Sequence, residues 1–203
     1  MKPILIILSG TPASGKTTIR KILESEFGFP AMSKDVIKEE LFDLLGWTDR
    51  EWSKQLGTFS IKLLFAWIER NLSKGVSCIV DCNFKKEWDL ETFLKFESEY
   101  SAQLINVHCT AKKEELIKRF ERRANGDLRH PGHCDSLNLD EFRELLSQPW
   151  QPVLECKDDV LILDTTTNSD ISVTTLISRL NNRIRTRRLC GIATHSASSN
   201  PTT

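Results

Sequence analysis

The stretch Ile4-Leu5-Ile6-Ile7-Leu8-Ser9-Gly10-Thr11-Pro12-Ala13-Ser14-Gly15-Lys16-Thr17-Thr18 decides how this chain folds. Residues 4–8 are all apolar, which is typical of a parallel strand that is buried on both faces. Residues 10–17 then match the complete phosphate-binding pattern Gly-x-x-x-x-Gly-Lys-Thr, and a helical stretch follows to about Phe27. A strand, this loop and a helix in direct succession predict a binding site for a nucleoside triphosphate.

Each fixed position of this phosphate loop has a physical role. Gly10 and Gly15 lack a Cβ atom, so the backbone can adopt positive φ and come close to a polyphosphate. The successive N–H groups and the positive end of the following helix then face the anion. Lys16 supplies a positive charge to the β- and γ-phosphates, and the Thr17 hydroxyl is placed to bind Mg²⁺. We therefore expect the nucleotide to bind Gly10, Thr11, Pro12, Ala13, Ser14, Gly15, Lys16, Thr17 and Thr18.

Length and composition indicate one domain without an overall charge. The chain has 203 residues, with 28 basic and 28 acidic side chains, so a nucleic acid would need a local basic patch. Its six cysteines include no Cys-x-x-Cys pair, which favours a reducing compartment. No apolar run approaches the roughly 20 residues that cross a bilayer. We expect a cytoplasmic protein without a signal peptide or membrane contact.

Apolar strand-like segments alternate with helical segments along the chain. The expected strands are 4–8, 29–32, 78–81, 103–109 and 160–164. The expected helices are 17–27, 33–45, 49–74, 87–100, 110–124, 138–146 and 170–187, with Ser33, Thr48 and Thr110 as caps of the second, third and fifth. This alternation predicts an α/β fold, a parallel sheet that is covered by helices on both faces.

Ligands of such sheets bind beyond the carboxyl ends of the strands, so chemistry is expected just after each strand. Asp35 follows the second strand and could accept the proton of an attacking hydroxyl, with Lys38 one turn further on to hold the substrate. The alternative is that Asp35 only complements the dipole in the first turn of a helix. The phosphate loop favours catalysis.

Two acidic residues end apolar strands and are candidates for a magnesium site. Asp81 follows Cys-Ile-Val, and Asp164 follows Leu-Ile-Leu. The third strand commonly neighbours the phosphate-loop strand in these sheets, so we favour Asp81 as a group that binds the metal through water or orders the substrate. Asp164 is interpreted as a cap or a residue near the base.

The helix after the fourth strand and the loop that follows it are rich in arginine. Arg119 and Arg123 share one helix face, whereas Arg122 lies on another. Arginines on a mobile segment can cover a transferring phosphoryl group and offset its developing charge. We expect a lid at about 119–138, with Gly126 and Gly132 as hinges; the alternative is a solvated helix face.

The end of the chain is also basic, with Arg179, Arg183, Arg185, Arg187 and Arg188 on the last helix. These side chains could contact a phosphate backbone, but cations late in a helix more often complement its dipole. We expect the domain to span 1–188 and residues 189–203 to form a polar, disordered tail.

With these positions, the chain resembles the P-loop kinases grouped with polynucleotide kinase, chloramphenicol phosphotransferase and the zeta toxins, and most of all the AAA-type ATP-binding members without an assigned substrate. The resemblance spans about residues 3–188. It implies a three-layer αβα P-loop NTPase fold with a five-stranded parallel sheet, similar to nucleoside kinases, and a helical lid.

The resemblance also implies roles for residues of the catalytic centre. Asp35 falls where polynucleotide kinase has its general base. Lys38 falls where a substrate-binding arginine is usual, which keeps the charge but loses the bidentate fork. Arg119 or Arg123 matches the lid arginine.

Further roles concern the acceptor. Asp81 and Asn83 match an Asp-x-Asn pair that lines the acceptor pocket. Arg129, His130 and His133 belong to a segment that looks like a signature of the unassigned members, and we expect them to bind the substrate.

Together these features predict a phosphotransferase that uses ATP, or GTP as the alternative, and Mg²⁺ to phosphorylate a hydroxyl group. A small-molecule acceptor is favoured because no broad basic groove is apparent. A 5′-hydroxyl polynucleotide kinase is the enzymatic alternative. A nucleotide-dependent sensor module with slow ATPase activity is the alternative from another class. The sequence indicates no oligomeric state.

Overall fold

The computed structural model describes residues 2–126, 129–135, 138–154, 159–167 and 170–193. Side chains are described for all of these residues except 170–171 and 186–193. Its centre is a five-stranded sheet of β1 (Ile4–Ser9), β2 (Ala31–Ser33), β3 (Cys78–Asp81), β4 (Gln103–Thr110) and β5 (Val160–Asp164). Every pair of neighbouring strands is parallel, in the order β2-β3-β1-β4-β5. The predicted α/β class and parallel sheet are confirmed.

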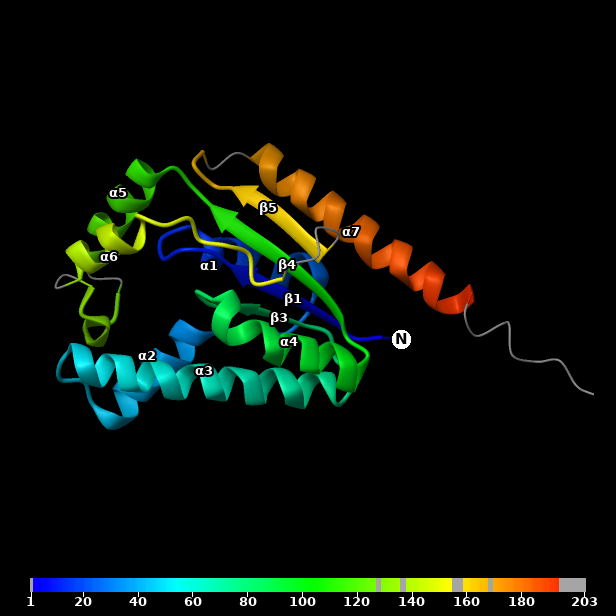
Figure 1. The fold of residues 1–203 in the computed structure, drawn as a ribbon, viewed down its shortest axis with the longest axis horizontal. Helices are drawn as coiled ribbons and strands as arrows, with labels where there is room; N and C mark the ends of the chain where they lie inside the picture. Colours follow the sequence, from blue (N-terminus) through cyan, green and yellow to red (C-terminus); the bar gives the residue numbers. More distant parts are fainter. Residues whose placement is uncertain (1, 127–128, 136–137, 155–158, 168–169, 194–203) are drawn as a thin grey trace, which may run out of the picture.

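Seven α-helices and one short 3-10 helix connect and cover the strands of the described chain (Figure 1). They are α1 (Lys16–Phe27), α2 (Lys34–Leu45), α3 (Arg50–Leu72), α4 (Lys86–Tyr100), α5 (Lys113–Ala124), η1 (Pro131–His133), α6 (Leu139–Leu145) and α7 (Asp170–Ala193). Within the described residues, no helix is long and apolar enough to cross a membrane.

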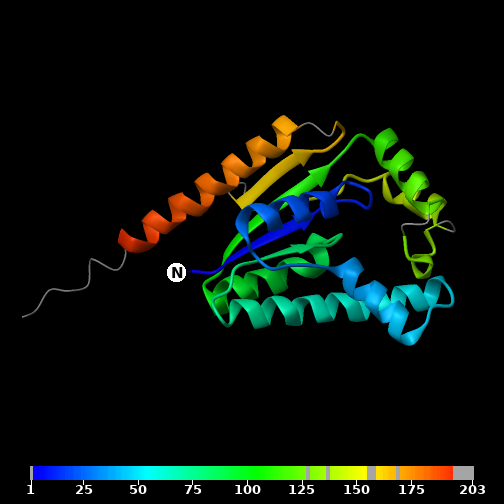
Figure 2. The same ribbon diagram turned by 180° about the vertical axis from the view of Figure 1, so that it is seen from behind.

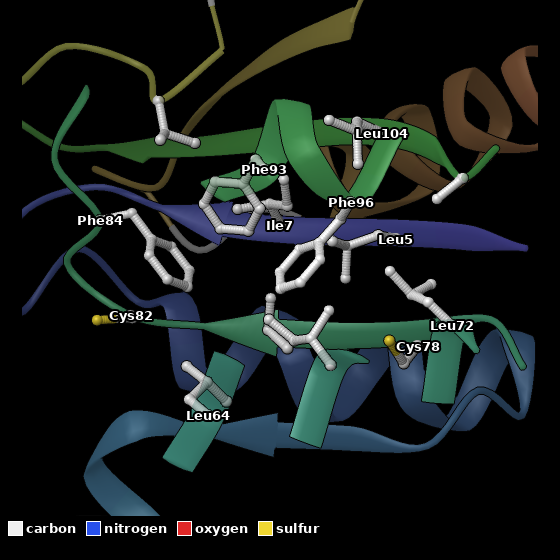
Figure 3. Close-up of a cluster of buried hydrophobic side chains, with 14 of the residues drawn as sticks. Leu5, Ile7, Leu64, Leu72, Cys78, Cys82, Phe84, Phe93, Phe96 and Leu104 are labelled. Atoms are coloured by element: carbon white, nitrogen blue, oxygen red, sulfur yellow. The ribbon is translucent and has the colours of Figure 1, made fainter. Parts of the chain in front are cut away.

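The alternation of side chains along β1 separates two hydrophobic cores. Leu5 and Ile7 pack with α3 and α4 on one face of the sheet, where Phe93 and Phe96 contribute aromatic rings (Figure 3). Ile4, Ile6 and Leu8 pack with α1 and α7 on the other face of the sheet. Figure 2, the view from behind, shows these two helices. Because both faces are covered, β1 is buried along its whole length, as its apolar sequence predicts.

A third, smaller apolar cluster joins α6 to α5, the helix that carries the first part of the expected lid. Both helices lie beyond the carboxyl ends of the strands (Figure 1). Phe120 of α5 stacks on Phe142 of α6, with ring centres 4.1 Å apart. The predicted hinge Gly132 has another role, because a Cβ atom there would lie 2.7 Å from the Phe42 ring. The glycine lets η1 pack closely on α2, so the lid rests on the body of the domain.

Three expectations about helix ends are wrong. The cap of α3 is Asp49, whose carboxylate accepts a hydrogen bond from the Trp52 amide at 2.8 Å, and not Thr48. Thr110 ends β4, where its hydroxyl donates to the Leu163 carbonyl, and α5 starts three residues later. Helix α7 continues to Ala193, past its expected end at about Arg187; residues 194–203 of the expected tail lie outside the described residues.

Removal of one ring from the larger core should lower stability strongly. Phe93 is fully buried, with ring centres 5.0 Å from Phe84 and 5.8 Å from Phe65. We expect Phe93→Ala to lower the free energy of unfolding by about 3–5 kcal/mol, measured by urea denaturation. The neighbouring Leu94→Ala, at a position that is 48% exposed, should cost about 0.5 kcal/mol or less. Equal losses in the two variants would contradict this description of the core.

Candidate active site

The phosphate loop connects β1 to α1 at the carboxyl edge of the sheet. Gly10 and Gly15 have φ of 131° and 81°, and Ala13 adopts 64°. No side chain caps the N-terminus of α1, so its first amide groups remain available to an anion. The Lys16 ammonium donates to the carbonyl oxygens of Gly10 and Thr11 at 3.0 and 2.7 Å. Burial lowers the pKa of Lys16.

Contacts with the neighbouring strands fix the loop. A Cβ atom at Gly10 would lie 2.2 Å from the carbonyl oxygen of Cys109 at the end of β4. The Thr165 hydroxyl, just after β5, lies 3.0 Å from the carbonyl oxygens of both Ser14 and Thr110. The loop is therefore held by the ends of two strands, β4 and β5.

A cleft of about 1160 Å³ opens in front of the loop and extends beneath the lid. It brings together most of the predicted site residues: Pro12, Ala13, Gly15, Lys16, Thr17, Thr18, Asp35, Lys38, Asp81, Asn83, Arg119, Arg123, Arg129 and His133. Gly10, Thr11, Ser14 and His130 are absent from its lining. The first three belong to the loop's own turn, of which Thr11 and Ser14 are buried.

Asp35 faces the cleft from the first turn of α2, which the Ser33 hydroxyl caps as predicted. The lid residue Arg129 donates to its Oδ2 at 2.9 Å. Enclosure in the cleft would by itself raise the pKa of Asp35, but the Arg129 guanidinium outweighs it and holds that pKa well below its usual range. The side chain keeps 44% of its surface exposed, which leaves room for an acceptor hydroxyl.

Glu39 and His133 continue this network away from the loop. His133 accepts from Arg129 at Nδ1 (3.0 Å), so its Nε2 carries the proton and donates to Glu39 at 2.8 Å. Burial and the nearby guanidinium lower the pKa of His133 to about 3, which keeps the ring neutral at physiological pH. His133 therefore orients Arg129 and does not act as a charged substrate ligand.

His130 takes a different place from its predicted one. Its ring stacks on Phe42 with centres 4.9 Å apart, and its Nδ1 accepts from the Gly132 amide at 3.0 Å. Its Nε2 lies 3.3 Å from Asp43. These contacts attach the lid to α2 outside the cleft.

Lys38 lies deep in the cleft, one turn after Asp35. Its ammonium donates to the Ser53 hydroxyl at 2.8 Å. Burial, together with the nearby Lys34 charge, lowers the pKa of Lys38 to about 8. Among the described residues no carboxylate lies within ion-pair distance of its ammonium group, so this charge remains available to a bound molecule.

Asp81 lies at the end of β3, next to the loop strand as expected. Its Oδ2 accepts from Arg20 at 3.0 Å and its Oδ1 from Ser33 at 3.1 Å. Since both oxygens already accept hydrogen bonds, Asp81 suits contact with a metal through water, and the hydroxyl of Thr17, an exposed residue, could supply a direct oxygen ligand. These donors fit Mg²⁺, which keeps several waters of its own. Asp164 instead accepts from the Thr166 amide at 2.8 Å and caps a turn.

The two predicted lid arginines point in different directions. Arg119 pairs with Glu115 at 2.8 Å and donates to the Thr165 carbonyl at 2.6 Å, so it connects α5 to the segment after β5. Arg123 pairs with Asp135 at 2.9 Å, a carboxylate that also lies 3.3 Å from Arg129. Arg129, which sequence reasoning assigned to the acceptor, is the lid arginine that contacts the candidate base.

Two contacts of the site were not predicted from the sequence. They are the ion pair of Arg20 with Asp81 and the hydrogen bonds by which Thr165 holds the phosphate loop. Arg20 lies one turn after Thr17 on α1, but no local pattern pairs it with a carboxylate 61 residues away. Three basic residues of α7 have described side chains. Arg183 donates to the Val160 carbonyl at 3.2 Å, and Arg179 and Arg185 are exposed. None of these three lines the cleft.

Comparison with known proteins supports the fold described above. Residues 5–149 match the AAA domain family AAA_33. A "putative kinase" from Chloroflexus aurantiacus J-10-fl is 32% identical, with a TM-score of 0.82 over 90% of this chain and 99% of that one. No curated protein matches the chain significantly.

Two more distant structures share the fold. A sugar kinase from Janibacter sp. HTCC2649 has a TM-score of 0.57 at 17% identity, over 88% of this chain and 95% of its own. A gluconokinase from Sinorhizobium meliloti 1021 has 0.53 at 18%, over 92% and 98%. The chain thus belongs to the AAA domain family of P-loop kinases, with nucleotide-dependent phosphotransfer as its general chemistry.

The contact between Arg129 and Asp35 can be tested by titration. Because the guanidinium favours the ionised carboxylate, Arg129→Gln should raise the pKa of Asp35, measured from the ¹³C shift of its carboxyl carbon against pH. Arg143→Gln, which removes an exposed arginine that pairs with Glu121 and Asp140, is the control and should leave that pKa unchanged. The same pKa for Asp35 in all three proteins would show that the lid does not contact it in solution.

Proposed function

We propose that this protein transfers the γ-phosphoryl group of ATP, with Mg²⁺, to a hydroxyl group of a small molecule. The observation that carries the proposal is the position of Asp35, which faces the same cleft as Lys16 and is held ionised by a lid arginine. A carboxylate opposite a phosphate loop can orient an attacking hydroxyl, which is the part of this chemistry that the loop does not provide.

The charges of the cleft support the transfer step. Lys16 and the loop amides offset the charge of the β- and γ-phosphates, while Arg123 and Arg129 lie on the lid side of the same space. Thr17 directly and Asp81 through water would hold Mg²⁺, which would supply positive charge to offset that of the phosphates. The chain's own groups therefore position the two reactants and stabilise the transferring group electrostatically.

The low pKa of Asp35 is compatible with its proposed role. Phosphoryl transfer passes through a loose transition state in which the attacking hydroxyl keeps its proton until late. A weak base that orients this hydroxyl through the free Oδ1, while Arg129 holds Oδ2, is therefore sufficient. Lys38, one turn along α2, would then contact the remainder of the acceptor.

We infer a reducing compartment such as the cytoplasm for this activity. The four cysteines among the described residues, Cys78, Cys82, Cys109 and Cys134, are free and buried. Burial raises the pKa of Cys78, Cys82 and Cys109 to about 12, so these thiols stay protonated and pack as apolar groups.

The proposal is tested by phosphate transfer from γ-labelled ATP, with GTP in parallel, to a small-metabolite extract and to a 5′-hydroxyl oligonucleotide. Asp35→Asn should slow transfer by about 10²–10⁴-fold, because it removes the proton acceptor, and should leave nucleotide binding intact, because Asp35 lies outside the phosphate loop. Asp43→Asn, on the same helix but outside the cleft, is the matched control and should retain transfer.

Three results would contradict the proposal. Label in the oligonucleotide alone would identify a nucleic-acid end kinase. Label only in free phosphate, at the same rate in Asp35→Asn, would indicate a nucleotide-dependent sensor that hydrolyses ATP. Full transfer activity in Asp35→Asn would remove this residue from the reaction.

A further inference from the structure

A second hollow, of about 500 Å³, opens beside the cleft at the start of α4. Lys85, Trp88 and Trp150 line both spaces, so the hollow is a side extension of the cleft and not a separate site. None of these three residues has a role in nucleotide binding or proton transfer in the mechanism above.

Trp88 presents a large apolar surface to solvent at this junction. The Lys85 ammonium lies 4.4 Å from the centre of its ring and covers one face, yet 72% of the residue remains exposed. The buried Asp89 carboxylate accepts from the Lys85 amide at 2.7 Å, which fixes the first turn of α4 and with it the position of Trp88. An indole that is exposed at the mouth of a cleft offers a flat apolar surface on which a ligand ring can stack.

Trp150 lines the same hollow, and the sheet holds it in position. Its indole N–H donates to the Phe84 carbonyl at 3.1 Å. The ring of His108, on β4, lies 3.0 Å from the Trp150 carbonyl at Nε2 and 2.8 Å from the Ser9 hydroxyl at Nδ1. Burial lowers the pKa of His108, so the neutral ring donates to Trp150 and accepts from Ser9. Trp150 is therefore preorganised from the strand that carries the phosphate loop.

The polar groups around the two rings indicate which kind of molecule fits. Three carboxylates line the hollow, from Glu87, Glu141 and Glu144, against the two ammonium groups of Lys85 and Lys86. The side-chain amides of Gln148 and Gln151 also line it. Arg50 pairs with Glu141 at 3.0 Å, so the described lining of the hollow has no excess of positive charge that would attract a polyphosphate chain. Carboxylates and amides instead suit hydroxyl groups, and indoles suit the apolar C–H face of a saturated sugar ring.

We propose that Trp88 and Trp150 form a subsite for a carbohydrate ring, so that the phosphoryl acceptor is a sugar or a glycoside that stacks on Trp88. This inference rests on the proposed function, since it names the acceptor class of the same cleft. The ring would lie in the side extension and direct one hydroxyl towards Asp35.

Binding can be tested without turnover, by saturation-transfer NMR on the protein with Mg²⁺ and a non-hydrolysable ATP analogue. The probes are methyl glucoside, an aminoglycoside, adenosine and a 5′-hydroxyl oligonucleotide. We expect saturation of ring C–H protons for at least one carbohydrate, with affinity about fivefold to tenfold weaker in Trp88→Ala and largely restored in Trp88→Phe. Trp47→Ala, at another exposed tryptophan outside both hollows, is the matched control and should bind like wild type.

The inference would be overturned by equal carbohydrate affinity in Trp88→Ala and wild type, by saturation of the adenosine or oligonucleotide base protons alone, or by no saturation of any probe. Its failure is distinguishable from failure of the proposed function. Carbohydrate binding that depends on Trp88 without phosphate transfer from γ-labelled ATP contradicts the kinase reaction only. Transfer to a hydroxyl compound that has no ring and is insensitive to Trp88→Ala contradicts the carbohydrate subsite only.

Discussion

The close passage of Gly10 over the end of β4 is the constraint on which the rest of the site depends. With a Cβ atom 2.2 Å from the Cys109 carbonyl oxygen, any other residue would push the phosphate loop away from the sheet. Only glycine also takes the φ of 131° at this point without strain. Because the loop lies so close, Thr165 reaches the Ser14 carbonyl, and Lys16 points into the space at the carboxyl ends of the strands.

Opposite the loop, a second set of contacts connects the lid to the acceptor side. Arg129 joins the lid to Asp35 and Glu39 of α2. The neutral His133 ring accepts a hydrogen bond from the Arg129 guanidinium and so orients that group toward the two carboxylates. Burying this arginine is tolerable because carboxylates surround it. Asp35 and Arg129 are thereby coupled, so an anion that attracts the Arg129 guanidinium would also change the environment of the Asp35 carboxylate.

The sequence predicts the parts that local patterns determine, and the sheet, the phosphate loop and the capped start of α2 all follow from short runs of residues. Contacts between distant segments leave no such trace. The Arg20–Asp81 pair joins α1 to β3, and a single arginine on a helix does not reveal its partner. Thr110 has the chemistry of a helix cap, but it instead forms the last residue of β4 and pairs with Asp164 of β5. Tertiary pairing thus decides where local preferences compete.

Calorimetric titration with Mg²⁺ and a non-hydrolysable ATP analogue tests most directly whether the loop of residues 10–17 binds a nucleoside triphosphate. Lys16→Ala should weaken binding about 10–100-fold, because it removes a charged hydrogen-bond donor from the phosphates. Lys62→Ala, on the exposed side of α3, should bind like wild type. Equal affinity in Lys16→Ala and wild type, or no binding to wild type, would contradict the account.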